Sequence, residues 1–170
     1  MIALYISDTQ ISLAHYSRVR NSPLLVSITA FDLQGSLVED LSREELAVNH
    51  LIHGIQAAND KVFITGNEIL VCLSDALVNH EAFQTEQDMS DADIITMVEW
   101  KKEKRWGPTA KKFQAFIELY NDRRQGHIIY MHDFLIQAIK KILRTFSGSP
   151  VWLGTESMVL SALGVLPIMT

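Results

Sequence analysis

The chain has 170 residues, of which 48% are hydrophobic and 21% are charged, and this composition excludes a disordered protein. The net charge of −5 argues against a nucleic-acid partner, because such binding depends on neutralising phosphates. The single cysteine, Cys72, excludes an intramolecular disulfide and a zinc site built from several cysteines. We expect a single domain over residues 1–170, with an inserted subdomain at about 74–125.

The hydropathy pattern bears on location and on partners. No apolar run reaches the roughly 18 residues of a membrane span, and the N-terminus lacks the basic and apolar regions of a signal peptide. We therefore expect a cytoplasmic protein. The mean hydropathy of +0.10 is high for a soluble domain. Either a protein partner covers apolar surface or the core is large, and both interpretations stay open.

The first part of the chain predicts a group of strands followed by a helix. Strands are predicted over residues 2–7, 11–17, 24–31, 61–65 and 68–73, with a polar turn at 8–10. The last two could instead form a single bulged strand, because periodicity does not distinguish the two arrangements. Ser42 has the character of an N-cap, and Glu45, three positions on, would complete a capping box. Apolar residues then recur at helical spacing as far as Ala58, which predicts a helix that ends at residues 59–60.

The second part predicts alternating strands and helices. Ser90, followed by Asp93, begins a helix that ends at Gly107. A short turn is expected at 76–79 and a loop at 121–126. The remaining predicted elements are strands over 81–85, 112–120, 127–131 and 151–153 and helices over 133–146 and 156–163. This order predicts an α/β (or α+β) protein with a mixed β-sheet and flanking helices.

Three features together resemble a known family. They are the opening strand–turn–strand, the helix carrying Glu99–Trp100 toward the turn at Trp106–Gly107–Pro108, and the closing strand–helix–strand–helix. They are similar to the actin-like ATPases of type IV pilus assembly and type II secretion, the PilM and GspL families. The resemblance covers nearly the whole chain but only the family's first lobe. It implies a ribonuclease H-like, actin-like single lobe.

The sequence departs from this family at the phosphate loop. Tyr5 stands where the family has Asp, Ser7 where it has Gly, and Ser12 where it has Lys. Glycine lets the backbone approach a phosphate and lysine offsets its charge, so both supports are absent. The degenerate loop consists of Ser7, Asp8, Thr9, Gln10 and Ser12.

The resemblance and this departure together imply a non-catalytic scaffold, a pseudo-ATPase with no bound cofactor. Such a protein would act in pilus or secretion assembly by protein–protein binding, with no nucleic acid involved. Its partner would be a protein component that holds it at the inner membrane, and a homodimer is a further option.

Four aromatic residues are candidates for partner binding, because large aromatics are enriched at interface hot spots. They are Trp100, Trp106, Phe113 and Phe116. The alternative is that they fill the core between the helix at 90–105 and the strand at 112–120.

A second hypothesis comes from a different class of protein. Asp8, Asp32 and Asp75 follow predicted strands, and converging carboxylates could serve a metal-dependent nuclease or phosphohydrolase of ribonuclease H-like fold. The competing interpretation is that strand-end aspartates cap their own turns. His50 and His53 lie three apart on one helix but lack a third ligand, so we expect no metal site there.

Overall fold

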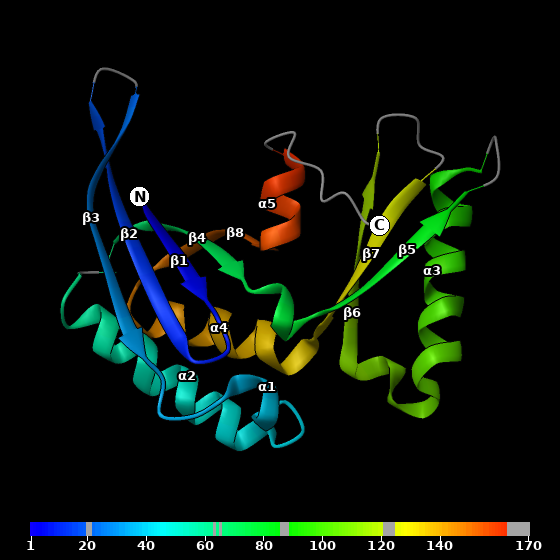
Figure 1. The fold of residues 1–170 in the computed structure, drawn as a ribbon, viewed down its shortest axis with the longest axis horizontal. Helices are drawn as coiled ribbons and strands as arrows, with labels where there is room; N and C mark the ends of the chain where they lie inside the picture. The colour runs from blue at the N-terminus through cyan, green and yellow to red at the C-terminus, as the bar shows by residue number, and fades with distance from the viewer. Residues whose placement is uncertain (20–21, 63, 65, 86–88, 121–124, 163–170) are drawn as a thin grey trace. The chain divides into compact units, whose positions relative to one another are not determined.

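The computed structural model describes residues 1–19, 22–62, 64, 66–85, 89–120 and 125–162. The chain divides into two compact units (Figure 1). The first unit comprises Met1–Leu77 and Leu135–Thr170, and the second comprises Val78–Phe134. The expectation of a single domain with an insertion at about 74–125 stays a prediction.

A five-stranded mixed sheet forms the centre of the first unit, with strand order β3-β2-β1-β4-β8. The strands are β1 (Ile2–Ile6), β2 (Gln10–Val19), β3 (Ser22–Asp32), β4 (Glu68–Leu73) and β8 (Ser149–Thr155). β1, β2 and β3 are antiparallel neighbours, whereas β4 pairs in parallel with both β1 and β8. The predicted α/β class with a mixed sheet is therefore confirmed.

One face of this sheet is closed by α2 (Glu44–Asn59) and α4 (Asp133–Thr145) (Figure 1). Alternate residues of β1 and β4 point into this layer and are fully buried. They are Ile2, Leu4, Ile6, Ile69, Val71 and Leu73. Gly54 of α2 lies so close to β2 that an added Cβ would meet Ile11 Cδ1 at 2.7 Å. The opposite face carries half-buried residues such as Tyr5 and Cys72.

The start of α2 differs from the prediction. A short helix that the sequence analysis missed, α1 (Leu37–Asp40), precedes it, and Ser36 is the N-cap of α1. α2 begins after Arg43, so Ser42 is not its cap and the predicted capping box is wrong. The cause is Asp40, which is buried, hydrogen-bonded by the Arg43 side chain, and 3.0 Å from His50 Nδ1. These contacts fix where the second helix begins.

The second unit pairs α3 (Asp91–Trp106) with an antiparallel sheet of order β5-β7-β6. Its strands are β5 (Asn79–Gln84), β6 (Phe113–Leu119) and β7 (Gln125–His132). A buried cluster joins helix and sheet, consisting of Phe83, Ile94, Val98, Phe113, Ile128 and Tyr130. The predicted capping box of Ser90 and Asp93 is confirmed, and α3 ends at Gly107, whose φ of +53° favours glycine.

The remaining elements are η1 (Asp75–Leu77), η2 (Gly107–Lys112) and α5 (Glu156–Ala162). η1 overlaps the turn predicted at 76–79, whereas η2 was not predicted. The predicted strand at 61–65 is not formed at residues 61, 62 and 64, while residues 63 and 65 lie outside the described part of the chain. The helix predicted over 156–163 is confirmed as far as residue 162, and the loop predicted at 121–126 lies mostly outside the described residues.

Within the described ranges, none of the helices combines the length and the apolar character needed to cross a lipid bilayer.

The two predicted N-caps give a matched stability test. Ser90→Ala removes the hydroxyl that accepts from Asp93 N, so we expect a loss of about 1 kcal/mol of unfolding free energy. Ser42→Ala removes no cap and should change stability by less than about 0.5 kcal/mol. Urea unfolding followed by circular dichroism measures both. Equal losses in the two variants would contradict the assignment of the caps.

Candidate functional site

The candidate site lies at the carboxyl ends of β1, β4 and β8. These three strands are parallel neighbours, so the chain segments that follow them meet at one edge of the sheet. Open α/β sheets bind their ligands at this edge. Here the edge is formed by the turn at residues 7–9, by Ser74 and Asp75, and by the first residues of α5.

The turn between β1 and β2 is closed by its own hydrogen bonds. Ser7 N donates to the carbonyl oxygen of Gln10 at 2.9 Å. The Ser7 hydroxyl donates to the same oxygen at 3.0 Å and accepts from Gln10 N at 3.1 Å. The Ser12 hydroxyl donates to Gln10 Oε1 at 3.3 Å. The hydroxyls of Ser7 and Ser12 are thus both hydrogen-bonded to Gln10 within the hairpin.

Asp8 ties this turn to α1. Its Oδ1 accepts from the Ser36 hydroxyl at 2.7 Å and from Val38 N at 2.8 Å. Its carbonyl oxygen accepts from Leu37 N at 2.8 Å, while that of Thr9 accepts from Leu33 N at 2.7 Å. Backbone N–H groups at the start of a helix are donors of the kind that bind phosphate, and here a carboxylate of the protein uses them.

Glu156, the first residue of α5, links all three parallel strands. Its Oε1 accepts from the Tyr5 hydroxyl of β1 at 2.7 Å. Its Oε2 accepts from the Ser74 hydroxyl at 3.0 Å and from Asp75 N at 2.9 Å, both just after β4. Asp75 in turn accepts from Ser157 N at 3.3 Å and from the Ser157 hydroxyl at 2.5 Å. We call Tyr5, Ser74, Asp75, Glu156 and Ser157 the edge cluster.

The edge cluster makes its surroundings unfavourable for negative charge. Burial raises the pKa of the Cys72 thiol to about 11, and the charges of Glu156 and Asp75 add to this shift. The pKa of Tyr5 is raised too, mainly by burial. A phosphate at this edge would therefore meet the like charges of Glu156 and Asp75, whose carboxylates already accept hydrogen bonds from the protein.

The three acids of the nuclease hypothesis occupy separate local contacts. Asp8 caps α1, Asp32 accepts from Gln10 Nε2 at 3.2 Å, and Asp75 bonds Ser157. Across the part of the chain that the structure describes, no three His, Cys, Asp or Glu side chains are grouped so as to hold a metal ion. Each of these partners lies in another segment of the chain, 22 to 82 positions away, so these contacts are not the local turn caps of the competing interpretation.

The four predicted partner-binding aromatics differ in exposure. Trp100 is 57% exposed, with Lys104 Nζ 4.9 Å from its ring centre. Trp106 stacks on Phe113 at 4.3 Å, and Phe113 belongs to the buried cluster of the second unit. Phe116 is half-buried. Burial gives Trp106 and Phe113 a packing role, and a role of the four in partner binding stays a prediction.

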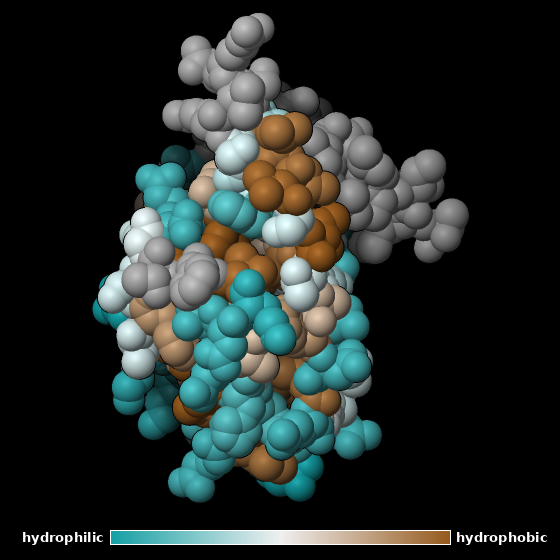
Figure 2. Space-filling model, turned by 90° about the vertical axis from the view of Figure 1, so that its left-hand side faces the viewer, coloured by the Kyte–Doolittle hydropathy of each residue, from teal (hydrophilic) through white to brown (hydrophobic). Residues whose placement is uncertain are grey.

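Four exposed apolar residues lie on the edge strand β3. They are Leu24 (54% exposed), Leu25 (46%), Val26 (55%) and Ile28 (66%), which we call the β3 patch. Figure 2 views the molecule from the side of this edge and shows hydrophobic residues gathered in its upper part. The run of apolar residues at 24–26 was visible in the sequence, but periodicity does not reveal that the strand ends a sheet.

Glu156 was not among the predicted site residues. The signal that could have found it is positional: Asp75 and Glu156 each follow the end of a predicted strand by two or three residues, and the carboxyl ends of neighbouring parallel strands share one edge. Asp75 was predicted as a strand-end acid together with Asp8 and Asp32, and Glu156 was not.

Comparison with solved structures shows where this fold occurs. The chain is similar to the cytoplasmic domain of EpsL, an inner membrane component of the type II secretion system of Vibrio cholerae, with a TM-score of 0.60 and 9% identity. It is also similar to a chain of the PilM–PilN type IV pilus biogenesis complex, with a TM-score of 0.63 and 16% identity. The matches cover 92% and 95% of this chain but 57% and 49% of the two neighbours, so the chain spans about half their length.

These likenesses show the fold, and the predicted actin-like architecture is confirmed at that level. No protein-family model and no curated protein matches the sequence.

The raised pKa of Cys72 gives a prediction for its chemistry. Because the thiolate is the reactive form, alkylation by iodoacetamide at pH 8 should be much slower than for a free cysteine. Glu156→Gln removes one nearby negative charge and should move the pH profile of alkylation to lower pH. Glu68→Gln, at the opposite end of β4, is the control and should leave the profile in place. A uniform rate increase at every pH would instead indicate loosened packing.

Proposed function

We propose that this protein is a non-catalytic scaffold in an assembly related to type IV pilus biogenesis or type II secretion. It would act by binding other proteins. Both structural neighbours come from such machineries, which supports the setting. The main support for a non-catalytic role is the position of Asp8. Its carboxylate accepts hydrogen bonds from the Ser36 hydroxyl and from Val38 N, beside the degenerate loop.

The charges of the first unit support this proposal. A nucleotide seated at the carboxyl edge would bring its phosphates toward Asp8, Asp75 and Glu156, and like charges repel most strongly where water is partly excluded. Two backbone donors of the turn, Ser7 N and Gln10 N, form hydrogen bonds within the turn itself. Binding would therefore require breaking existing hydrogen bonds without a lysine to offset the new charge.

The β3 patch is the surface that we propose for a protein partner. Exposed apolar groups of this kind mark interaction sites. An edge strand also offers unpaired backbone groups to an added strand. The inner-membrane setting of EpsL suggests a membrane-associated component as partner, which would hold this chain at the cytoplasmic side. A second copy of the chain is the other candidate, and Trp100 is a further candidate contact.

Calorimetric titration with ATP and Mg²⁺ tests the non-catalytic proposal. We expect no binding heat up to millimolar nucleotide, because the donors at the degenerate loop are occupied. Ser7→Gly/Ser12→Lys restores the two family residues and serves as a comparison that could gain weak binding. Micromolar affinity of the unchanged chain for ATP would overturn the proposal.

Light scattering at increasing protein concentration tests the β3 patch. Ile28→Lys places a charge on the patch and should reduce any self-association. Ile95→Lys, on α3, changes a residue that is 55% exposed and serves as the control. Both sites are exposed, so unfolding free energies should stay within about 0.5 kcal/mol of the original. Equal effects of the two variants on association would contradict a role for this patch.

A further inference from the structure

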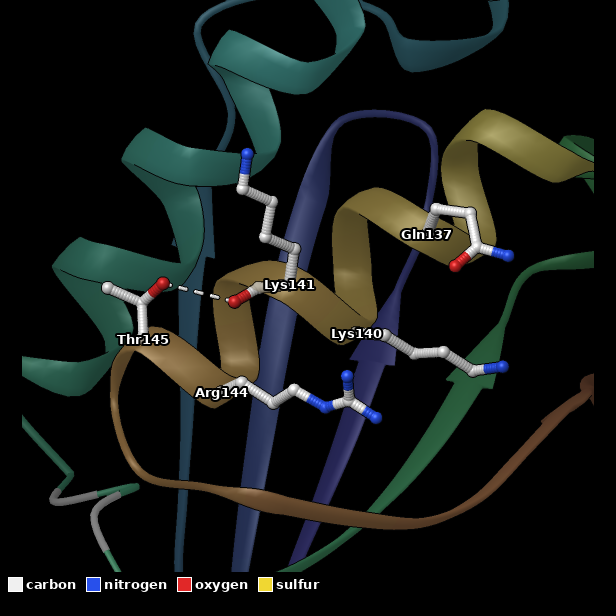
Figure 3. Close-up of a pocket in the computed structure, with 5 residues that line it drawn as sticks. All are labelled: Gln137, Lys140, Lys141, Arg144 and Thr145. Atoms are coloured by element: carbon white, nitrogen blue, oxygen red, sulfur yellow. Dashed lines mark hydrogen bonds between the residues drawn. The ribbon is translucent and has the colours of Figure 1, made fainter.

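A basic pocket lies on α4, within the first unit (Figure 3). Its volume is about 500 Å³. The lining residues are Gln137, Lys140, Lys141, Arg144 and Thr145. Their spacing of three, four, seven and eight positions from Gln137 places them along one side of the helix. The pocket therefore gathers three positive charges along a short stretch of one surface.

These charges are not neutralised from within the protein. Lys140, Lys141 and Arg144 form no ion pair with any acidic side chain in the described ranges, although the chain as a whole carries a net charge of −5. Arg144 suits the last turn of α4, where cations interact favourably with the helix dipole. Lys140 lies a full turn earlier, where this effect has faded, so the dipole does not account for the whole group.

The directions of the side chains define a two-pronged arrangement. Figure 3 shows Lys140 and Arg144 extending from the same side of α4, while Lys141 points toward α2. Four residues of helix separate the two Cα atoms by about 6 Å along the axis. Carboxylate groups on successive turns of a bound helix, or two residues apart on an extended segment, have a comparable spacing.

We infer that this pocket binds an acidic segment of a protein partner. Arginine and lysine form strong charge-assisted hydrogen bonds with carboxylates, and Arg144 can bind one through two parallel bonds. The lining residues include three cations and no acidic side chain, which favours a segment whose carboxylates have the spacing of Lys140 and Arg144. The inference rests on the proposed scaffold function and adds the chemistry of one partner.

Fluorescence anisotropy tests it with a labelled peptide of alternating Glu and Ala, using a Gln–Ala peptide as the neutral comparison. Lys140→Gln/Arg144→Gln should weaken binding of the acidic peptide at least tenfold, since two charge-assisted contacts are lost. Lys61→Gln/Lys111→Gln removes the same net charge from exposed positions outside the pocket and should weaken it less than about twofold. Raising the ionic strength should weaken binding of the original chain.

Three outcomes would overturn the inference: no binding of the acidic peptide, equal losses in the two double variants, or equal binding of the neutral peptide. Vesicles of phosphatidylglycerol and phosphatidylcholine test whether the pocket binds a membrane surface instead of a protein segment. Binding to these vesicles that the pocket variant abolishes, without peptide binding, would make the occupant a membrane surface instead. The ATP titration tests the proposed function independently of the pocket. Binding of ATP at the degenerate loop would overturn the scaffold function but would not change the result for the acidic peptide.

Discussion

The carboxylate of Glu156 is the contact on which the carboxyl edge of the sheet depends. It accepts hydrogen bonds from the Tyr5 hydroxyl, the Ser74 hydroxyl and Asp75 N, and so joins β1, the end of β4 and the start of α5. A partly buried carboxylate is stable only when donors satisfy it, and removing them would leave an uncompensated charge. Together with the bonds between Asp75 and Ser157, this side chain fixes the start of α5 against the ends of β1 and β4.

The groups bonded to Glu156 also bear on function, because they occupy the edge of the sheet where a ligand would bind. In open α/β sheets the carboxyl edge is where ligands are held, and function depends on the groups placed there more than on the sheet itself. Here the Tyr5 hydroxyl bonds to Glu156 and the Ser7 hydroxyl bonds within its own turn. The sheet order and the helix layer are retained, while the polar groups at the edge bind one another.

The sequence predicted the local structure where local rules decide it. The alternation in β1 and the reciprocal cap of Ser90 and Asp93 were readable because the interacting positions are close in sequence. Glu156 was missed because its partners lie 151 and 82 positions away. Ser42 followed the sequence rule for a cap, but the buried Asp40, held by Arg43, moved the helix start to Glu44. The exposure of Ile28 was also out of reach, since it depends on β3 being an edge strand.

The distribution of charge in the first unit favours one kind of contact over another. Asp75 and Glu156 lie at the carboxyl edge, whereas Lys140, Lys141 and Arg144, which form no ion pair within the described ranges, lie on α4. An anionic nucleotide is repelled where the fold would ordinarily hold it, whereas an acidic protein segment meets attraction on the helix. The exposed apolar residues of β3 add a contact that does not depend on charge, so affinity and orientation can come from different surfaces. Such a division suits a scaffold, because a partner held at two chemically different sites can bind in only one orientation.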